Sequence, residues 1–233
     1  MTVHSLWQAG LDWLLPCYCA GCGEQRVQPS QPICYACLSD LYESAYDTST
    51  QEHLEEVFWG RIPLQSVIVP FPLRNGSILQ HTLHQLKYNH RPHIGRFLGM
   101  IAANTLITRN LETPIDAVLP LPLHPTKQRK RGYNQAECIC EGIGQATGLP
   151  IWRDIVQRTR FTESQTNKDR GQRWANMQGT FCLWNADQAR GKHLLLVDDV
   201  LTTGATLEAC GHAILQIPDI RLSIFALGRT EIG

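Results

Sequence analysis

The chain has 233 residues, of which 43% are hydrophobic, and its 21 basic and 21 acidic residues give a formal net charge of zero. This length suits one ordinary domain with a small appendage. No apolar run approaches membrane-spanning length, and the N-terminus lacks a basic start and carries Asp12, unlike a signal peptide. These features argue against a secreted or membrane protein, so we expect a cytoplasmic protein without membrane insertion.

The zero net charge hides an uneven distribution of charged residues. Residues 1–60 hold one basic residue, Arg26, and eight acidic ones, whereas residues 124–173 hold ten basic and five acidic residues. A positive segment in the middle of the chain favours an anionic ligand or a nucleic acid, while an acidic N-terminal segment is poorly suited to contact phosphate backbones.

Five of the nine cysteines gather near the N-terminus: Cys17, Cys19, Cys22, Cys34 and Cys37. The last four form two Cys-x-x-Cys pairs separated by eleven residues, and two such pairs can supply four thiolates to tetrahedral Zn²⁺. We favour a structural zinc ion, because a segment of this size cannot build its own core. A redox dithiol and a nucleic-acid-binding finger are the alternatives. Cys17 could displace Cys19, although only Cys19 has the two-residue spacing.

The cysteines are followed by a predicted short helix at residues 38–45 and by the polar, acidic stretch 47–56, which we interpret as a domain boundary. The sequence therefore predicts a zinc-finger segment with its linker over residues 1–60 and a larger domain over residues 61–233.

Strands and helices alternate through the larger domain. Strands are predicted at 65–71 (interrupted at Pro70), 117–123, 154–157, 180–183, 193–197 and 222–227, and helices at 77–88, 93–108, 133–147 and 207–215. Asn134 and Glu137 are spaced like a capping box, and Gly148 ends the helix that they begin. The alternation predicts an α/β fold with a mainly parallel sheet flanked by helices, and a site at the carboxyl ends of the strands.

The most informative segment begins with an apolar run, residues 194–197, that is typical of a buried parallel strand and stops at Asp198 and Asp199. A hydroxyl- and glycine-rich turn then leads into a helix, and such a turn offers backbone N–H groups and a helix dipole to a phosphate. Its residues are Thr202, Thr203, Gly204, Ala205 and Thr206. The two carboxylates would repel a bare phosphate, but they can accept hydrogen bonds from sugar hydroxyls. We therefore expect a ribose 5-phosphate ligand; the alternative is an Asp-rich turn and a capped helix without a ligand.

Two further segments are candidates for contacts with a diphosphate. The proline-rich end of the strand at 117–123 runs through His124 into the basic stretch 127–135, which opens a helix. The polar stretch 158–176 lies between two predicted strands, and long polar loops in compact domains are often lids. Its candidate residues are Arg158, Arg160, Gln165, Arg170, Arg173 and Asn176. For each basic residue alone, an ordinary surface charge is the alternative.

Residues 194–206 resemble the thirteen-residue phosphoribosyl pyrophosphate (PRPP) signature of type I phosphoribosyltransferases. Taken with Pro120-Leu-Pro-Leu123, Arg131-Gly-Tyr-Asn-Gln135 and the Gln…Arg…Asn loop, the chain is similar from Cys19 to Arg229 to the ComF (competence protein) family. That family also carries a four-cysteine zinc finger before a phosphoribosyltransferase-like domain, and its members are implicated in natural transformation and in the use of imported DNA. Tyr133 stands where phenylalanine is common, and Cys17 is an additional cysteine.

The resemblance implies roles for the motif residues. Asp198 and Asp199 would hold the ribose 2′- and 3′-hydroxyls and place negative charge beside the cation that develops at C1, and residues 202–206 would wrap the 5′-phosphate. Mg²⁺ would bridge pyrophosphate and ribose. The pyrophosphate and lid contacts would come from Leu123, His124, Arg131, Arg170 and Arg173, and zinc would be held by Cys19, Cys22, Cys34 and Cys37.

Three functional interpretations stay open because no base-reading motif is visible. The first is a phosphoribosyltransferase with an unknown acceptor, and the second is a PRPP-binding module without catalysis. The third is a single-stranded-DNA-binding accessory protein that works with a competence helicase or a recombination protein; Tyr133, Trp152 and Trp174 could stack on bases. The basic segment and the Gln…Arg…Asn loop favour retained PRPP chemistry, with DNA binding as an addition.

Overall fold

The computed structural model describes residues 17–47, 53–109, 111, 113–158 and 180–230. The helices are α2 (Tyr35–Glu43), α4 (Ile78–Tyr88), α5 (Pro92–Thr108), α6 (Pro125–Arg131), α7 (Gln135–Thr147) and α9 (Ala205–Ile214), with 3₁₀ turns at His53–Phe58 and Ala186–Ala189. The strands are β1 (Ser66–Ile68), β2 (Phe71–Leu73), β3 (Ala117–Pro120), β4 (Val156–Arg158), β5 (Phe181–Leu183), β6 (His193–Leu201) and β7 (Arg221–Thr230).

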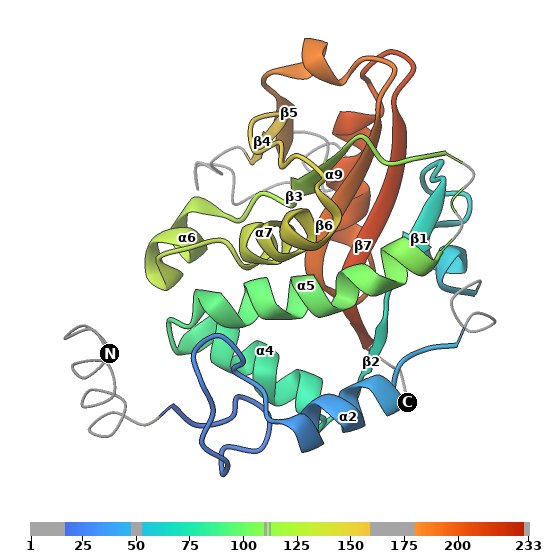
Figure 1. The fold of residues 1–233 in the computed structure, drawn as a ribbon. Coiled ribbons are helices and arrows are strands. Elements are labelled where there is room, and N and C mark those ends of the chain that lie inside the picture. Colours follow the sequence, from blue (N-terminus) through green and yellow to red (C-terminus); the bar gives the residue numbers. More distant parts are fainter. Residues whose placement is uncertain (1–16, 48–52, 110, 112, 159–179, 231–233) are drawn as a thin grey trace, which may run out of the picture.

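A five-stranded parallel sheet forms the centre of the molecule (Figure 1). Its order is β1-β7-β6-β3, and β2 continues the edge by pairing with the end of β7. Pro120 of β3 aligns with Val197 of β6, and Val197 aligns with Phe225 of β7, so the carboxyl ends of these strands meet at one edge. The predicted α/β fold with a mainly parallel sheet is confirmed. The strands predicted at 154–157 and 180–183 form a separate antiparallel pair, β4–β5.

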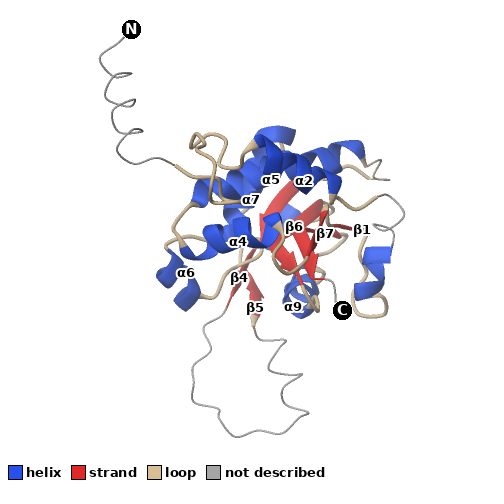
Figure 2. Ribbon diagram, turned by 90° about the horizontal axis from the view of Figure 1, so that it is seen from below, coloured by secondary structure: helices blue, strands red, loops and turns tan. Residues whose placement is uncertain are grey.

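Helices cover both faces of the sheet (Figures 1 and 2). Leu195 and Val197 of β6 face the layer of α4, α5 and α7, whereas Leu194 and Leu196 face α9. Alternate residues of a strand point to opposite faces, so a strand that is buried on both sides reads as a continuous apolar run. This explains the run that the sequence places before the acidic pair.

Several element ends follow the local signals in the sequence. The hydroxyl of Ser77 accepts a hydrogen bond from the Gln80 N–H and caps α4, and Gly148 ends α7 in the left-handed conformation with φ +76°. Asn134 caps α7 by accepting from Ala136 N–H. Glu137, expected to complete a capping box, instead pairs with Arg153.

Two local predictions differ from the structure. Strand β6 does not stop at the acidic pair but continues through it to Leu201, which pairs with Arg229 of β7. The basic stretch does not lead straight into the helix predicted at 133–147, because Pro125–Arg131 form a separate helix, α6, whose side chains are all at least partly exposed. A helix without a buried face has no apolar periodicity, which is why the sequence does not predict this one.

The cysteine-rich segment packs against α4 and contributes to the same core as one face of the sheet. Cys19, Ile33 and Leu41 are buried in this cluster together with Leu79 and Leu83 of α4. The predicted division near residue 60 stays a prediction. Within the described part of the chain, no helix combines the length and apolar character needed to traverse a bilayer.

Candidate functional site

The two acidic residues of β6 lie side by side in the strand but point to opposite faces of the sheet. Asp199 continues the face of Leu195 and Val197, toward α4, and Asp198 continues the face that α9 covers. Asp198 also accepts a hydrogen bond from the Asp199 N–H at 2.8 Å. The structure thus brings the two predicted ribose ligands together at the end of the sheet, in two different environments.

Asp199 has a cationic partner that sequence reasoning missed. Lys87, in the last turn of α4, places its Nζ 2.9 Å from Asp199 Oδ2, and the two side chains are only 22% and 10% exposed. The residues are 112 positions apart, so no local pattern signals the contact.

Asp198 lies among groups that change its acidity. Desolvation by the surrounding protein, followed by the nearby charge of Asp199, raises the pKa of Asp198 to about 7, although Lys87 and Arg158 oppose the shift. Burial likewise raises the pKa of the Cys210 thiol on α9, with the Asp198 charge as the second cause. Asp198 can therefore gain or lose a proton near neutral pH.

The hydroxyl- and glycine-rich turn lies between β6 and α9 as predicted. Gly204 is the N-cap of α9 and has φ +73°, a conformation that favours glycine. Thr202, Thr203 and Thr206 are exposed, and the Thr203 hydroxyl accepts from Ala205 N–H at 3.5 Å. The turn therefore presents hydroxyls and the start of a ten-residue helix at the carboxyl edge of the sheet.

The segment just before β1, which spans the predicted division near residue 60, packs against this turn. Arg61 donates from Nη1 to the carbonyl oxygens of Val57 at 2.8 Å and Thr203 at 2.9 Å, and it pairs with Glu208 of α9. A Cβ atom at Gly204 would come within 2.8 Å of the Phe58 ring. The 3₁₀ turn His53–Phe58 and Arg61 thus pack against the turn between β6 and α9, a role that the acidic composition of this stretch does not reveal.

The segment after β3 lies beside the acidic pair, since β3 and β6 are neighbours. Leu121 N–H donates to Val197 O at 2.8 Å and Pro122 has no N–H, so the amides of Leu123 and His124 are the candidates for an anionic ligand. His124 accepts from Thr126 N–H through Nδ1 and caps α6. A pocket of about 320 Å³ lies along this segment, and its lining includes Leu123 and Arg158.

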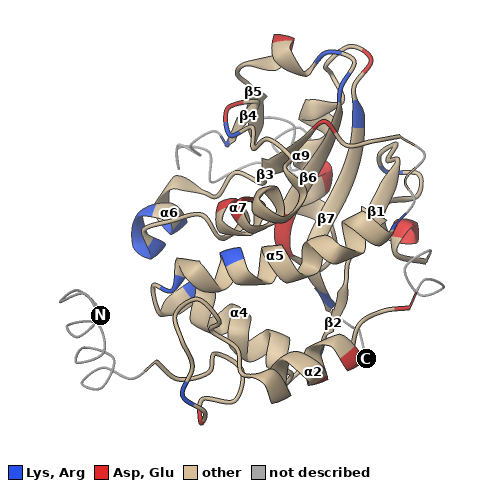
Figure 3. Cartoon of the chain, in the orientation of Figure 1, with Lys and Arg blue, Asp and Glu red and all other residues tan. Residues whose placement is uncertain are grey.

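Helix α6, which follows β3, is rich in basic residues, and Figure 3 shows Lys and Arg positions gathered along its ribbon. The Arg131 guanidinium lies over the Tyr88 ring, 5.6 Å from its centroid, and the ring is 58% exposed. Strands β4 and β5 flank the predicted lid. Arg170, Arg173 and the rest of residues 159–179, including Arg160, Gln165, Trp174 and Asn176, lie outside the described residues.

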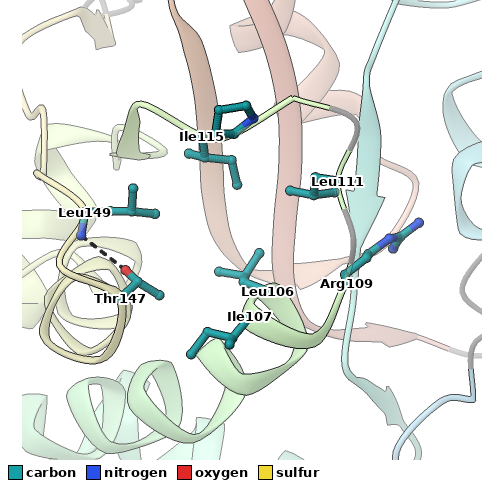
Figure 4. A pocket seen from close by; sticks show the side chains of 8 residues that line it. Leu106, Ile107, Arg109, Leu111, Ile115, Thr147 and Leu149 are labelled. Atoms are coloured by element: carbon teal, nitrogen blue, oxygen red, sulfur yellow. Dashed lines mark hydrogen bonds between the residues drawn. The ribbon is translucent and has the colours of Figure 1, made fainter.

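A separate apolar pocket lies at the opposite end of the strands. It has a volume of about 330 Å³ and is lined from the end of α5, the segment before β3 and the end of α7 (Figure 4). Leu106 and Ile107 face Ile115 and Leu149 there, and Thr147 Oγ1 accepts from Leu149 N–H at 3.3 Å. This pocket is remote from the acidic pair and contributes nothing to the candidate site.

The four predicted zinc ligands come together. The sulfur atoms of Cys19, Cys22, Cys34 and Cys37 all lie within 4.8 Å of one another, and Cys17 is not in this group. Cys19 Sγ accepts from the N–H groups of Gly21 at 3.3 Å and Cys34 at 3.2 Å. Burial raises the pKa of Cys19, but N–H groups from Cys34, Cys22 and Gly21 outweigh it and lower that pKa to about 7. Such an arrangement suits thiolate ligation of a tetrahedral metal ion.

The parallel sheet, with an acidic pair and a hydroxyl- and glycine-rich turn at the carboxyl end of its strand β6, defines a type I phosphoribosyltransferase-like protein with an added four-cysteine cluster. Competence protein F of Haemophilus influenzae is 26% identical to the chain over 220 residues, which is 91% of this chain and 90% of that protein. DNA utilization protein YhgH of Salmonella typhimurium is 26% identical over 215 residues, 91% of this chain and 84% of that protein. Competence protein ComFC of Bacillus subtilis is 28% identical over 101 residues, 42% of this chain and 38% of that protein. The resemblance of the chain to the ComF family is therefore confirmed. No family model matches the chain.

Phosphoribosyltransferases of known structure share less sequence identity with the chain than these relatives do. The glutamine PRPP amidotransferase of B. subtilis aligns with a TM-score of 0.37 and 15% identity, over 61% of this chain and 26% of that chain. The hypoxanthine phosphoribosyl transferase of Trypanosoma cruzi aligns with a TM-score of 0.36 and 15% identity, over 61% and 66%. The fold class rests on the strand order of the sheet and on the position of the acidic pair and the following turn at the end of β6.

Proposed function

We propose that the protein binds PRPP together with Mg²⁺ at the turn after β6 and transfers the phosphoribosyl group to an acceptor. The observation that carries this proposal is the conformation of Gly204, which is the N-cap of α9 with φ +73° and follows the acidic pair in the same connection between β6 and α9. A left-handed glycine at a helix start turns successive N–H groups toward one point, where an anion is stabilised by them and by the helix dipole.

The ligand's parts have separate partners in this proposal. The exposed hydroxyls of Thr202, Thr203 and Thr206 join the N–H groups of the turn around the 5′-phosphate. Asp198 and Asp199 accept hydrogen bonds from the ribose hydroxyls. In this proposal their negative charge also stabilises the positive charge that develops on the ribose during transfer.

Transfer displaces pyrophosphate from C1 of the ribose. A lone pair of the acceptor forms the new bond to C1 while the bond from C1 to the pyrophosphate oxygen breaks, and that oxygen keeps the electron pair. The amides of Leu123 and His124 and the guanidinium of Arg131 bind the departing anion in this proposal, and Arg170 and Arg173 close over it. Mg²⁺ bound with the ligand would neutralise negative charge on the pyrophosphate.

We propose a structural Zn²⁺ for the cysteine cluster. Four sulfurs within 4.8 Å and two N–H donors to Cys19 Sγ fit a closed tetrahedral site better than an open catalytic one. None of the nine cysteines, all of which lie in the described part of the chain, forms a disulfide, which is typical of a reducing compartment, so we also propose a cytoplasmic location.

The names of the relatives support a role in DNA uptake or DNA utilisation, where a competence helicase or a recombination protein would be the partner. A second candidate function, single-stranded DNA binding without catalysis, is favoured by one observation. Helix α6 carries Arg129, Lys130 and Arg131 in its last turn, and Arg131 lies over the exposed ring of Tyr88. A positive helix beside an exposed aromatic ring can contact phosphates and stack on a base.

Binding of ribose 5-phosphate followed by phosphorus NMR tests the phosphate site. We expect the wild-type protein to shift and broaden the phosphate resonance, and Thr203→Val and Thr206→Val together to weaken binding roughly tenfold, because two hydrogen bonds to an anion are removed. Thr108→Val, at the end of α5, serves as the matched control. Equal binding by both variants would contradict the assignment of the turn.

A further inference from the structure

Lys87 is held against the acidic pair more closely than a surface lysine would be. Its ammonium lies 2.9 Å from Asp199 Oδ2, and the side chains are 22% and 10% exposed. A comparable pair at the other end of β6, Lys192 and Asp116, lies at 3.1 Å with side chains 45% and 32% exposed. The free energy of an ion pair depends on how far water screens it, so the charge of Lys87 acts more strongly on its partner.

The contact between Lys87 and Asp199 is electrostatic and leaves the carboxylate incompletely bonded. Asp199 Oδ2 is inaccessible to solvent and, despite the short distance to Nζ, has no hydrogen bond of normal geometry among the described residues. A buried oxygen without a hydrogen bond costs free energy, which a better-placed partner can recover. The ion pair, rather than a well-formed hydrogen bond, therefore holds Lys87 against Asp199.

Asp198 does not share this lysine on equal terms. It points to the other face of the sheet, and the charges of Lys87 and of Arg158, whose guanidinium lies over the Phe181 ring at 5.4 Å, both oppose the rise of its pKa. A divalent ion that approaches Asp199 therefore meets the positive charge of Lys87 first.

We propose that Lys87 is the resident counter-cation of Asp199, which a divalent cation displaces only when it arrives together with an anionic sugar phosphate. This inference rests on the proposed ribose phosphate site. Without the ligand, a divalent cation and the ammonium would compete for one carboxylate and repel each other. With the ligand, the phosphate charge compensates the released lysine, so cation and sugar phosphate bind cooperatively. Lys87 is a positioning residue that makes occupation by the cation depend on the ligand.

Binding of Mn²⁺, followed by electron paramagnetic resonance of the free ion at pH 8, tests this role. Mn²⁺ takes the same oxygen ligands as Mg²⁺ and is directly visible. We expect Lys87→Met to bind Mn²⁺ roughly tenfold more tightly than wild type when no sugar phosphate is present, because the competing charge is gone. Ribose 5-phosphate should then strengthen Mn²⁺ binding strongly in the wild type and only slightly in the variant.

Matched controls separate the charge from other effects. Lys192→Met removes the comparable lysine far from the site and should leave Mn²⁺ binding unchanged, and Lys87→Arg keeps the charge and should resemble the wild type. Lys87→Met combined with Asp199→Asn should lose the gain in affinity. If circular dichroism shows that Lys87→Met does not fold, Lys87→Gln, which removes the same charge, takes the place of Lys87→Met in every comparison.

Unchanged or weaker Mn²⁺ binding by the charge-removing variant would overturn the proposal. Failure of the proposed function gives a different result, because the wild type would then bind no ribose 5-phosphate at any Mn²⁺ concentration. The comparison of Mn²⁺ binding by the wild type and the variant without the sugar phosphate would still test the role of Lys87.

Discussion

Gly204 and Phe58 are in direct contact: a Cβ atom added to Gly204 would lie 2.8 Å from two carbons of the Phe58 ring. The contact joins the turn between β6 and α9 to the 3₁₀ turn His53–Phe58, which precedes the sheet. It also means that two separate constraints, the left-handed backbone and the space left by the ring, require glycine at this position.

Gly204→Ala is expected to lower the free energy of unfolding by roughly 2 to 4 kcal/mol, since it adds left-handed strain to steric overlap with Phe58. Gly148→Ala is the matched control, because Gly148 has φ +76° and a Cβ atom added there would meet no atom within 4 Å, so only the strain is added. We expect a loss of about 1 kcal/mol there. Urea denaturation measures both, and equal losses would contradict the packing role of Phe58.

Asp198 should make stability fall as the pH rises from about 4 to about 7. Its pKa is raised from 3.8 to about 7 in the folded protein, so over this range the folded state binds more protons than the unfolded state. Protonation stabilises the fold at low pH, and the cost of ionising the group is complete above about pH 7. Thermal denaturation of Asp198→Asn should show a flatter pH dependence in this range.

Asp116 provides a control of opposite sign for that measurement. The N–H of His193 and the ammonium of Lys192 lower the pKa of Asp116, so its contribution is present above its unfolded pKa and is lost as the pH falls through the folded pKa. Asp116→Asn should therefore destabilise the protein at neutral pH and leave the slope due to Asp198 in place. If Asp198→Asn keeps the wild-type slope, the slope has another source.

Cys37→Ser should abolish stoichiometric zinc binding and detach the N-terminal segment, because Cys37 is buried where the cysteine cluster packs near α4. We expect its zinc content to fall well below one ion per chain and residues before α4 to become sensitive to protease. Cys17→Ser, outside the cluster, should retain zinc. A zinc-loaded Cys37→Ser protein, or a zinc-free Cys17→Ser protein, would show that the ligands are assigned incorrectly.

If single-stranded DNA binds at α6, its affinity should fall steeply with salt. Arg129→Gln and Lys130→Gln together should reduce the slope of log affinity against log salt by roughly 0.7 for each phosphate interaction that the change removes, and Tyr88→Ala should cost about 1 to 3 kcal/mol because a base can no longer stack on the ring. Fluorescence anisotropy measures both effects. Lys192→Gln is the control for charge at a distance, and an equal effect in that variant would argue against a local interaction.

Local signals predicted much of the fold. Ser77 and Gly148 marked helix ends, Pro70 marked the break between β1 and β2, and the apolar run marked β6, because each is decided by residues near one another in the chain. Helix α6 escaped prediction since it has no buried residue and is defined by its cap at His124 and its end at Gly132.

The sequence predicted the residues of the candidate site, but not the residues from distant parts of the chain that contact them. The acidic pair and the turn after it form one continuous motif. Lys87 and Arg61, in contrast, reach Asp199 and Glu208 over 112 and 147 positions of sequence, and only the packing of α4 and of the segment before β1 brings them there. Contacts over such separations leave no periodic or spacing signal in a single sequence.

Calorimetric titration with PRPP and Mg²⁺ tests the central claim most directly, with Asp198→Asn as the variant and Asp116→Asn as its matched control. We expect saturable binding by the wild type and by Asp116→Asn, and binding at least roughly tenfold weaker by Asp198→Asn, whose neutral amide keeps one acceptor oxygen but loses the negative charge that strengthens a hydrogen bond from a ribose hydroxyl. Equal affinity in all three proteins, or no PRPP binding by the wild type, would contradict the assignment of a phosphoribosyl site to the end of β6.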